Sequence, residues 1–261
     1  MRYFLELAYN GTPFHGWQSQ PNALSVQAIL ESALSKILKN KIDVTGAGRT
    51  DAGVHARCMY AHFDSEEEIR DISKFILSLN SLCGKYISID RLIKVKNDAH
   101  ARFDAVERTY KYFVTYKKSP FFNDLCWFTP NHLDMEMMNE AARSLLETKD
   151  FTSFAKLHSD AKTNICEVRK ARWMCVGDDI DAKNFIGDLQ GGIVFTISAD
   201  RFLRNMVRAI VGTLVDVGRH KLSIEDFKSI ILKKNRCSAG TSMPAHALFL
   251  WDIRYNSEQI L

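Results

Sequence analysis

The chain has 261 residues, of which 46% are hydrophobic and 25% charged, a balance typical of a globular protein with one large domain or two modest ones. Its formal net charge of +4 is too small by itself to identify a nucleic-acid-binding protein. The first residues predict a strand rather than a secretory leader, and no uncharged run approaches membrane-spanning length, so we expect a cytoplasmic protein. The six cysteines form no Cys-x-x-Cys pair, which favours reduced thiols over disulfides or a zinc site.

The first part of the chain predicts the order βαββαβ. Alternating apolar residues indicate a strand at 2–9, and helical spacing indicates a helix at 25–39. Strands at 42–47, 57–64 and 85–95 and a second helix at 66–79 complete the series. A Ser65…Glu68 capping box would open the second helix, placing the acidic run 66–68 in its first turn, where negative charge favours the helix dipole.

The second part of the chain predicts the same order. Strands are expected at 108–116, 166–176, 191–198 and 246–254, and helices at 134–147, 201–217 and 223–233. The repeated order predicts an α/β (α+β) protein built from two tandem ferredoxin-like βαββαβ units. We set the first domain at residues 1–104 and the second at 105–261. The segment 117–133, rich in Phe, Pro and Asn, is either a flexible connection or an ordered binding loop.

A glycine-rich turn with an aspartate lies between two predicted strands, in the sequence GAGRTDAGVHA at 46–56. Its glycines allow backbone angles and close ligand approach that other residues forbid. Asp51 follows Arg49 by two residues, an arrangement suited to presenting a reactive carboxylate. A dinucleotide fingerprint would need its third glycine at Asp51, and no Gly-Lys-Ser/Thr follows, so the loop fits neither phosphate-binding rule. A metal site that includes Asp51 and His55 has no support from His-Glu-x-x-His or paired-cysteine spacing.

Cations and aromatic residues alternate along the strand predicted at 108–116 and just beyond it. The set comprises Arg108, Tyr110, Lys111, Tyr112, Tyr116, Lys117 and Lys118. Such a set supplies positive charge for phosphates and aromatic faces for bases. A solvated strand edge with inward-facing tyrosines would show the same pattern, so both interpretations stand.

The run GRTDAGVHA at 48–56 resembles the signature of the TruA family of tRNA pseudouridine synthases. Other stretches resemble motifs of that family in the same order: YNGTPFHGWQSQ at 9–20, ARFDA at 101–105 with RTYKY at 108–112, and FLRNMVRAIVG at 202–212. In the first of these, Trp17 either contacts RNA or packs in the core. The stretch MPAHAL at 243–248 departs from the pattern, with Ala247 where the family often has glycine, which affects the shape of the pocket.

The resemblance implies two ferredoxin-like halves whose antiparallel sheets join around a central active-site cleft. It also implies a homodimer that isomerises uridine to pseudouridine in the anticodon stem-loop of tRNA, around positions 38, 39 and 40. The reaction breaks the C1′–N1 bond, rotates the uracil and joins its C5 to C1′, and it calls for no metal or organic cofactor. Asp51 would be the nucleophile, attacking either C6 of the base or C1′ of the ribose.

The resemblance gives roles to further residues. Arg208, in a mostly apolar predicted helix, would form an ion pair with Asp51 and keep it ionised. Tyr110 would stack on the uracil, with its hydroxyl placed to accept the C5 proton. Arg49 would help to extrude the target base, for which a planar cation is suited. The remaining expected substrate-binding residues are Arg204, which either shares the ion pair or reaches a phosphate, His55 and Leu248.

Two other functions fit parts of the pattern. A non-catalytic RNA-binding protein with two RRM-like units would share the βαββαβ order, but it would need an RNP1-type Gly-Phe-Gly-Phe strand and has no use for Asp51 in a glycine turn. A nucleotide-dependent enzyme would use the glycine-rich loop for phosphate, which the missing third glycine opposes.

Overall fold

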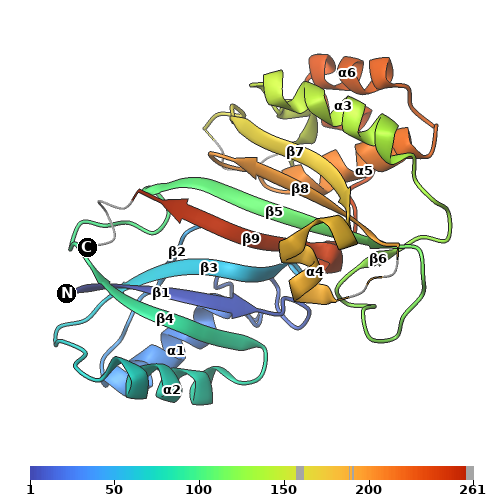
Figure 1. Cartoon of the computed structure of the whole chain (residues 1–261). Coiled ribbons are helices and arrows are strands. Elements are labelled where there is room, and N and C mark those ends of the chain that lie inside the picture. The colour runs from blue at the N-terminus through green and yellow to red at the C-terminus, as the bar shows by residue number, and fades with distance from the viewer. Residues whose placement is uncertain (157–161, 188, 190, 257–261) are drawn as a thin grey trace. The chain divides into compact units, whose positions relative to one another are not determined.

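A computed structural model of the chain describes residues 1–156, 162–187, 189 and 191–256 (Figure 1). The chain divides into two compact units, one formed by Met1–Arg108 with the segment from Phe249 onward, the other by Thr109–Leu248. The described residues contain nine strands and six α-helices, and most strand pairs are antiparallel, which confirms the mixed α/β class. No described helix combines the length and the apolar character that crossing a membrane requires.

The sheet of the first unit has the strand order β4-β1-β3-β9, with β2 paired to β3. Its elements are β1 (Arg2–Tyr9), α1 (Val26–Leu38), β2 (Thr45–Gly46), β3 (His55–Asp64), α2 (Ile72–Cys83), β4 (Ile87–Val95) and most of β9 (Leu248–Tyr255). β1 is antiparallel to both of its neighbours, whereas β9 runs parallel to β3, with Phe249 opposite His55. Helices α1 and α2 pack against one another, and in Figure 1 both lie below the strands of this unit.

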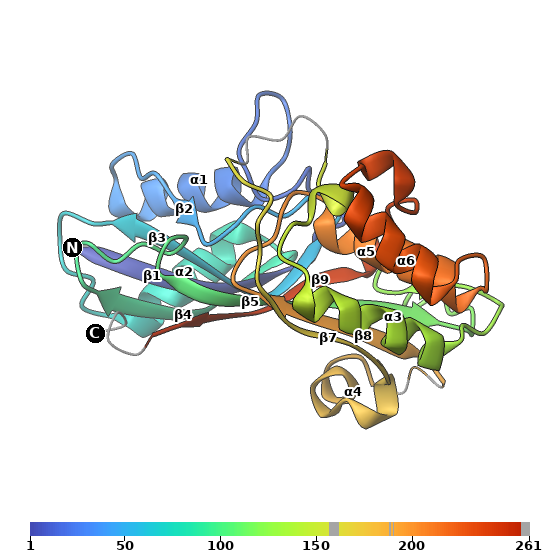
Figure 2. The same ribbon diagram turned by 90° about the horizontal axis from the view of Figure 1, so that it is seen from above.

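The sheet of the second unit has the order β5-β8-β7, with β6 paired to β5. Its elements are β5 (Ala105–Thr115, in this unit from Thr109), β6 (Trp127–Phe128), α3 (Met135–Glu147), β7 (Val168–Cys175), α4 (Ile180–Ile186), β8 (Ile193–Ala199), α5 (Met206–Gly218) and α6 (Ile224–Lys233). Figure 2 shows α3, α5 and α6 on one side of β7 and β8 and the short α4 on the other. β7 and β8 are antiparallel.

The helices follow from apolar spacing and from caps. In α1, Ser25 caps the first turn by accepting a hydrogen bond from the amide of Ala28, and the buried side chains recur on one face. α5 is different, because nearly all of its residues are buried. That degree of burial places α5 in the interior of the second unit, and Arg208 is one of its two residues that are only half-buried.

The predicted start of the second helix is wrong. α2 begins at Ile72, where Asp71 accepts a hydrogen bond from the amide of Lys74 at 2.9 Å, so the cap lies six positions later than Ser65. The Ser65 hydroxyl instead donates to the carbonyl oxygen of Glu67 at 2.7 Å. The acidic run 66–68 therefore precedes the helix, and Glu68 pairs with Lys94. Asp71 lies directly before the apolar spacing of α2 and caps the helix, so it prevails over the capping-box pattern at Ser65 and Glu68.

Other boundaries also differ from the prediction. The strand expected at 42–47 is reduced to the two residues of β2, and the helix expected at 201–217 begins at Met206. Asn205, with φ of 65°, adopts the left-handed conformation just before α5, which separates the helix from the segment 201–204. Helix α4 was not predicted; its seven residues are too few for helical periodicity to be visible.

Candidate active site

The loop around Asp51 connects β2 to β3 and is fastened to the N-terminal loop that follows β1. The hydroxyl groups of Tyr9 and Thr50 share a hydrogen bond of 2.9 Å. The amide of Trp17 donates to the carbonyl oxygen of Thr50 at 3.2 Å, and the amide of Gly53 donates to that of Phe14 at the same distance. The residues on both sides of Asp51 are thus held in place by a single neighbouring loop.

Two glycines allow the backbones of these loops to touch. A Cβ atom on Gly11 would lie 2.0 Å from the carbonyl oxygen of Val54. A Cβ atom on Gly16 would lie 2.5 Å from the carbonyl oxygen of Thr50, and Gly16 also has a positive φ of 95°. A larger residue at either position would push the two loops apart.

Asp51 itself occupies a tight turn. Its carbonyl oxygen accepts a hydrogen bond from the amide of Val54 at 3.1 Å, and Gly53 supplies the positive φ of 77° that the turn needs. Asp51 is half-buried and Arg49 is exposed. The sequence therefore presents a carboxylate on a fixed backbone, as a nucleophile requires.

His55 and Trp17 support this loop from within the first unit. His55 is 1% exposed, its Nδ1 accepts a hydrogen bond from the amide of Gly11 at 3.0 Å, and its ring stacks on Phe249 with centroids 4.5 Å apart. Trp17 is buried against Gly46, so of its two alternatives the structure shows core packing. Both residues hold the aspartate loop rather than extend into solvent.

In the second unit, Tyr110 lies on β5 and is half-buried. Its ring meets that of Phe202 edge to face, with centroids 5.0 Å apart and an interplanar angle of 83°. This geometry is favourable for aromatic pairs and fixes the direction of the tyrosine ring.

Lys111 fits neither interpretation of the alternating cations and aromatic residues on its strand. This side chain is buried, and its Nζ lies 2.6 and 2.7 Å from the two carboxylate oxygens of Asp179. Burial raises the pKa of Asp179, but hydrogen bonds from Lys111 and from the amide of Ala182 outweigh it and leave the pKa below its usual range. Lys111 therefore neutralises a buried carboxylate that also caps α4.

Arg208 lies on α5 and is held by the segment before β9. Its Nε donates to the carbonyl oxygen of Met243 at 2.5 Å, and the amide of Met243 donates to the carbonyl oxygen of Arg208 at 3.1 Å. Arg204 is exposed ahead of the helix, and its carbonyl oxygen accepts from the amide of Lys156. Leu248 is buried where β9 begins.

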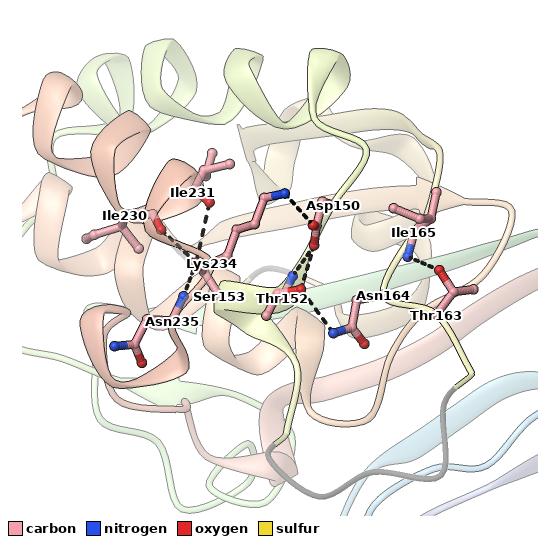
Figure 3. A network of polar contacts seen from close by, with 10 residues as sticks. All are labelled: Asp150, Thr152, Ser153, Thr163, Asn164, Ile165, Ile230, Ile231, Lys234 and Asn235. Carbon is pink, nitrogen blue, oxygen red and sulfur yellow. Dashed lines mark hydrogen bonds and ion pairs between the residues drawn. The ribbon is translucent and has the colours of Figure 1, made fainter.

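A polar network fastens the segment that leads to Lys156 (Figure 3). The buried hydroxyl of Ser153 donates to the carbonyl oxygen of Ile230 at 2.6 Å and accepts from the amide of Asn235 at 3.1 Å. Lys234 pairs with Asp150 at 2.9 Å. These contacts tie the 3-10 helix at 152–154 to the end of α6, and through Lys156 they support the backbone at Arg204.

The predicted residues are divided between the two units. Asp51, Arg49 and His55 belong to the first, whereas Tyr110, Arg204, Arg208 and Leu248 belong to the second. The ion pair between Asp51 and Arg208 would join the units and stays a prediction. Within the described residues, no three His, Cys, Asp or Glu side chains gather as metal ligands would.

The comparisons with known proteins cover nearly the whole chain. A family model described as tRNA pseudouridine synthase matches residues 7–104 and 141–256. The chain is 52% identical over 257 residues to tRNA pseudouridine synthase A of Parabacteroides distasonis, covering 98% of this chain and 97% of the relative. For the proteins of the same name from Bacteroides fragilis and Bacillus licheniformis, identity is 53% over 257 residues and 38% over 261. Those alignments cover 98% of this chain in both cases, and 97% and 100% of the relatives. The chain therefore belongs to the TruA family of tRNA pseudouridine synthases, which are isomerases.

Proposed function

We propose that this protein isomerises uridine to pseudouridine in the anticodon stem-loop of tRNA, around positions 38, 39 and 40. Membership of the family supports the reaction and the substrate. The observation that carries the proposal is the turn at Asp51, whose two flanks are fastened to the N-terminal loop. Such a turn holds a carboxylate in one direction, so little entropy is lost when it attacks the bound nucleotide.

Asp51 acts as the nucleophile and Arg208 as its partner. An ionised carboxylate attacks C6 of the uracil or C1′ of the ribose, and either route frees the base to rotate before C5 joins C1′. Desolvation in a closed site would favour the neutral acid, so a neighbouring guanidinium is needed to keep Asp51 ionised. The contacts between Arg208 and Met243 support this role, because they orient the arginine before substrate arrives.

Tyr110 and the exposed Arg49 and Arg204 contact the nucleotide. The fixed ring of Tyr110 stacks on the uracil while its hydroxyl lies near C5, where a proton must leave. Arg49 fills the space left by the extruded base, and Arg204 contacts phosphate.

The proposed architecture is two ferredoxin-like halves, residues 1–104 and 105–261, with joined sheets and the active site in the cleft between them. The order β4-β1-β3-β2 and the antiparallel pairs of the first unit support the first half. By analogy with the family, we propose a cytoplasmic homodimer.

Release of tritium from a tRNA transcript that carries 5-³H-uridine tests the proposal, because forming the C5–C1′ bond expels that hydrogen. Transcripts that keep uridine only at position 38, 39 or 40 would identify the targets. We expect release from these and none from a transcript that lacks all three. Tight tRNA binding with no release from any transcript would instead support the RNA-binding alternative.

A further inference from the structure

The loop between β4 and β5, residues 99–104, is held by side chains of its own unit. Three of its carbonyl oxygens accept hydrogen bonds: that of Ala99 from Arg2 at 2.9 Å, that of Ala101 from the Tyr255 hydroxyl at 2.6 Å and that of Arg102 from Arg108 at 2.5 Å. Three amides are held as well: that of His100 by Asp104, that of Ala101 by His62 Nδ1 and that of Arg102 by His100 Nδ1. These six hydrogen bonds, together with others such as that from the amide of Phe103 to His100 Nδ1 at 3.3 Å, fix this loop.

At the tip of this loop, the structure exposes an aromatic ring. Phe103 is 73% exposed, although its ring contacts that of His100 with centroids 4.2 Å apart. His100 in turn meets the buried ring of His62 at 4.7 Å. The three rings run from the buried His62 through His100 to the exposed Phe103, so packing on His100 fixes the position of the Phe103 ring.

A cation accompanies the exposed ring. The guanidinium of Arg102 lies 5.8 Å from the centroid of Phe103, and Arg102 is exposed. The carboxylate of Asp104, in the same loop, accepts a hydrogen bond from the amide of His100. A single exposed apolar side chain is ordinary, as for Leu77 on α2 at 70% exposure, but Leu77 stands on a helix face without such a support.

We infer that Arg102 and Phe103 form an RNA-contact platform, on which an unpaired base of the tRNA stacks against Phe103 while Arg102 pairs with a neighbouring phosphate. An aromatic face beside a guanidinium is the combination that single-stranded RNA recognises. Protein interfaces also use aromatic and arginine side chains, but this chain belongs to a family that acts on tRNA, which favours RNA over a second protein copy as the occupant. The inference rests on the proposed function only for the identity of the RNA, and the platform positions the substrate without touching the reacting atoms.

The test measures binding of an unmodified tRNA transcript and the kcat and KM of tritium release, with the full-length protein. Phe103→Ala should weaken binding and raise KM about 5- to 150-fold, with kcat and the salt dependence of binding unchanged. Phe103→Tyr should restore the parental values, because it keeps the stacking face. Arg102→Ala should reduce the slope of log K against log salt by about one. Leu77→Ala, and Arg70→Ala on an exposed arginine just before α2, are the matched controls and should leave these quantities unchanged.

The inference is overturned if Phe103→Ala binds tRNA as tightly as Leu77→Ala does, or if Phe103→Tyr fails to restore binding. A change in sedimentation of Phe103→Ala with unaltered tRNA affinity would also overturn it, and would identify the surface as a protein contact. Failure of the proposed function looks different, since the parental protein would then bind tRNA without releasing tritium, and the binding measurements would still decide the role of Phe103.

Discussion

The aspartate loop and the arginine motif are both held in place, but with a different balance of backbone and side-chain contacts. The loop at 46–56 touches its neighbour through backbone atoms, at positions where Gly11 and Gly16 leave no room for a side chain. The arginine motif also has one such backbone approach, at Gly212 beside the carbonyl oxygen of Thr241, but it and the nearby strand β5 add charged side-chain contacts, Arg208 with the carbonyl oxygen of Met243 and Lys111 with Asp179. Backbone contact tolerates almost no substitution, whereas a pair of side chains such as Lys111 and Asp179 can be replaced if both partners change together.

The largest effect should come from Asp51, which the loop at 46–56 presents. Asp51→Asn should abolish tritium release, because the amide keeps the size of the side chain but lacks the ionised oxygen. Affinity for tRNA should change little, since phosphate contacts elsewhere remain. Asp43→Asn, on an exposed aspartate just before β2, is the control and should retain full activity. Turnover of Asp51→Asn within about tenfold of the parent would eliminate Asp51 as the nucleophile.

Lys111→Met tests the buried ion pair between Lys111 and Asp179 in the second unit. Removing the cation leaves Asp179 buried without its partner, which should cost about 3–5 kcal/mol in the free energy of unfolding. The double variant Lys111→Met/Asp179→Leu should recover most of that loss and retain a deficit of about 1 kcal/mol, because Asp179 also caps α4. Urea unfolding followed by circular dichroism measures both.

Lys94→Met serves as the control for this pair, because Lys94 and Glu68 are exposed and their ion pair should be worth less than about 1 kcal/mol. If Lys111→Met loses no more stability than Lys94→Met, the buried pair has no structural role.

Gly11→Ala tests the backbone contact between the N-terminal loop and the aspartate loop in the first unit. The added Cβ would lie 2.0 Å from the carbonyl oxygen of Val54, so the two loops must separate. We expect a loss of about 1–3 kcal/mol in stability. The accompanying shift of the Asp51 turn should lower kcat about 100-fold, as small misplacements of catalytic groups do. In contrast, Gly177→Ala, outside the aspartate loop, has open space around its Cβ and should be nearly silent. Equal kcat values for the two variants would contradict the close-packed loops.

The sequence was sufficient for elements with strong periodicity and for motifs defined by glycine. Apart from β6, α4, the shortened β2 and the starts of α2 and α5, the strands and helices were located within a few residues, and the loop of Asp51 lies between β2 and β3 as expected. The start of α2 was misplaced because two capping patterns compete within seven residues, and only the packing of the buried face, Phe75, Leu79 and Cys83, favours Asp71. The alternation of cations and tyrosines along its strand also indicated that Lys111 is exposed, whereas its side chain is buried.

Long-range contacts explain most of what could not be predicted. Lys111 and Asp179 are 68 positions apart, and neither segment by itself predicts that they pair. The support of the aspartate loop was only partly visible, since Gly11 and Gly16 were noted as part of a motif without the contacts that require them. Phe103 was likewise within a quoted motif, but only the structure shows that it is exposed on a fixed loop.

The smallest effect concerns His62, which supports the loop at 99–104 in the first unit. Burial, with the charges of Arg2 and His100, lowers the pKa of His62 to about 4 in the folded protein. In the unfolded chain this histidine takes up a proton near its ordinary pKa of 6.5, so the unfolded state binds more protons as the pH falls below that value. Stability should be unaffected above pH 6.5 and should decline between pH 6.5 and 4, by about 2 kcal/mol at pH 5. His62→Gln keeps an acceptor for the amide of Ala101 and cannot titrate, so its urea midpoint should change less between pH 7 and pH 5 than that of the parent. If the two proteins lose stability equally over this range, another group is responsible, and the polar support of the loop does not depend on a neutral histidine.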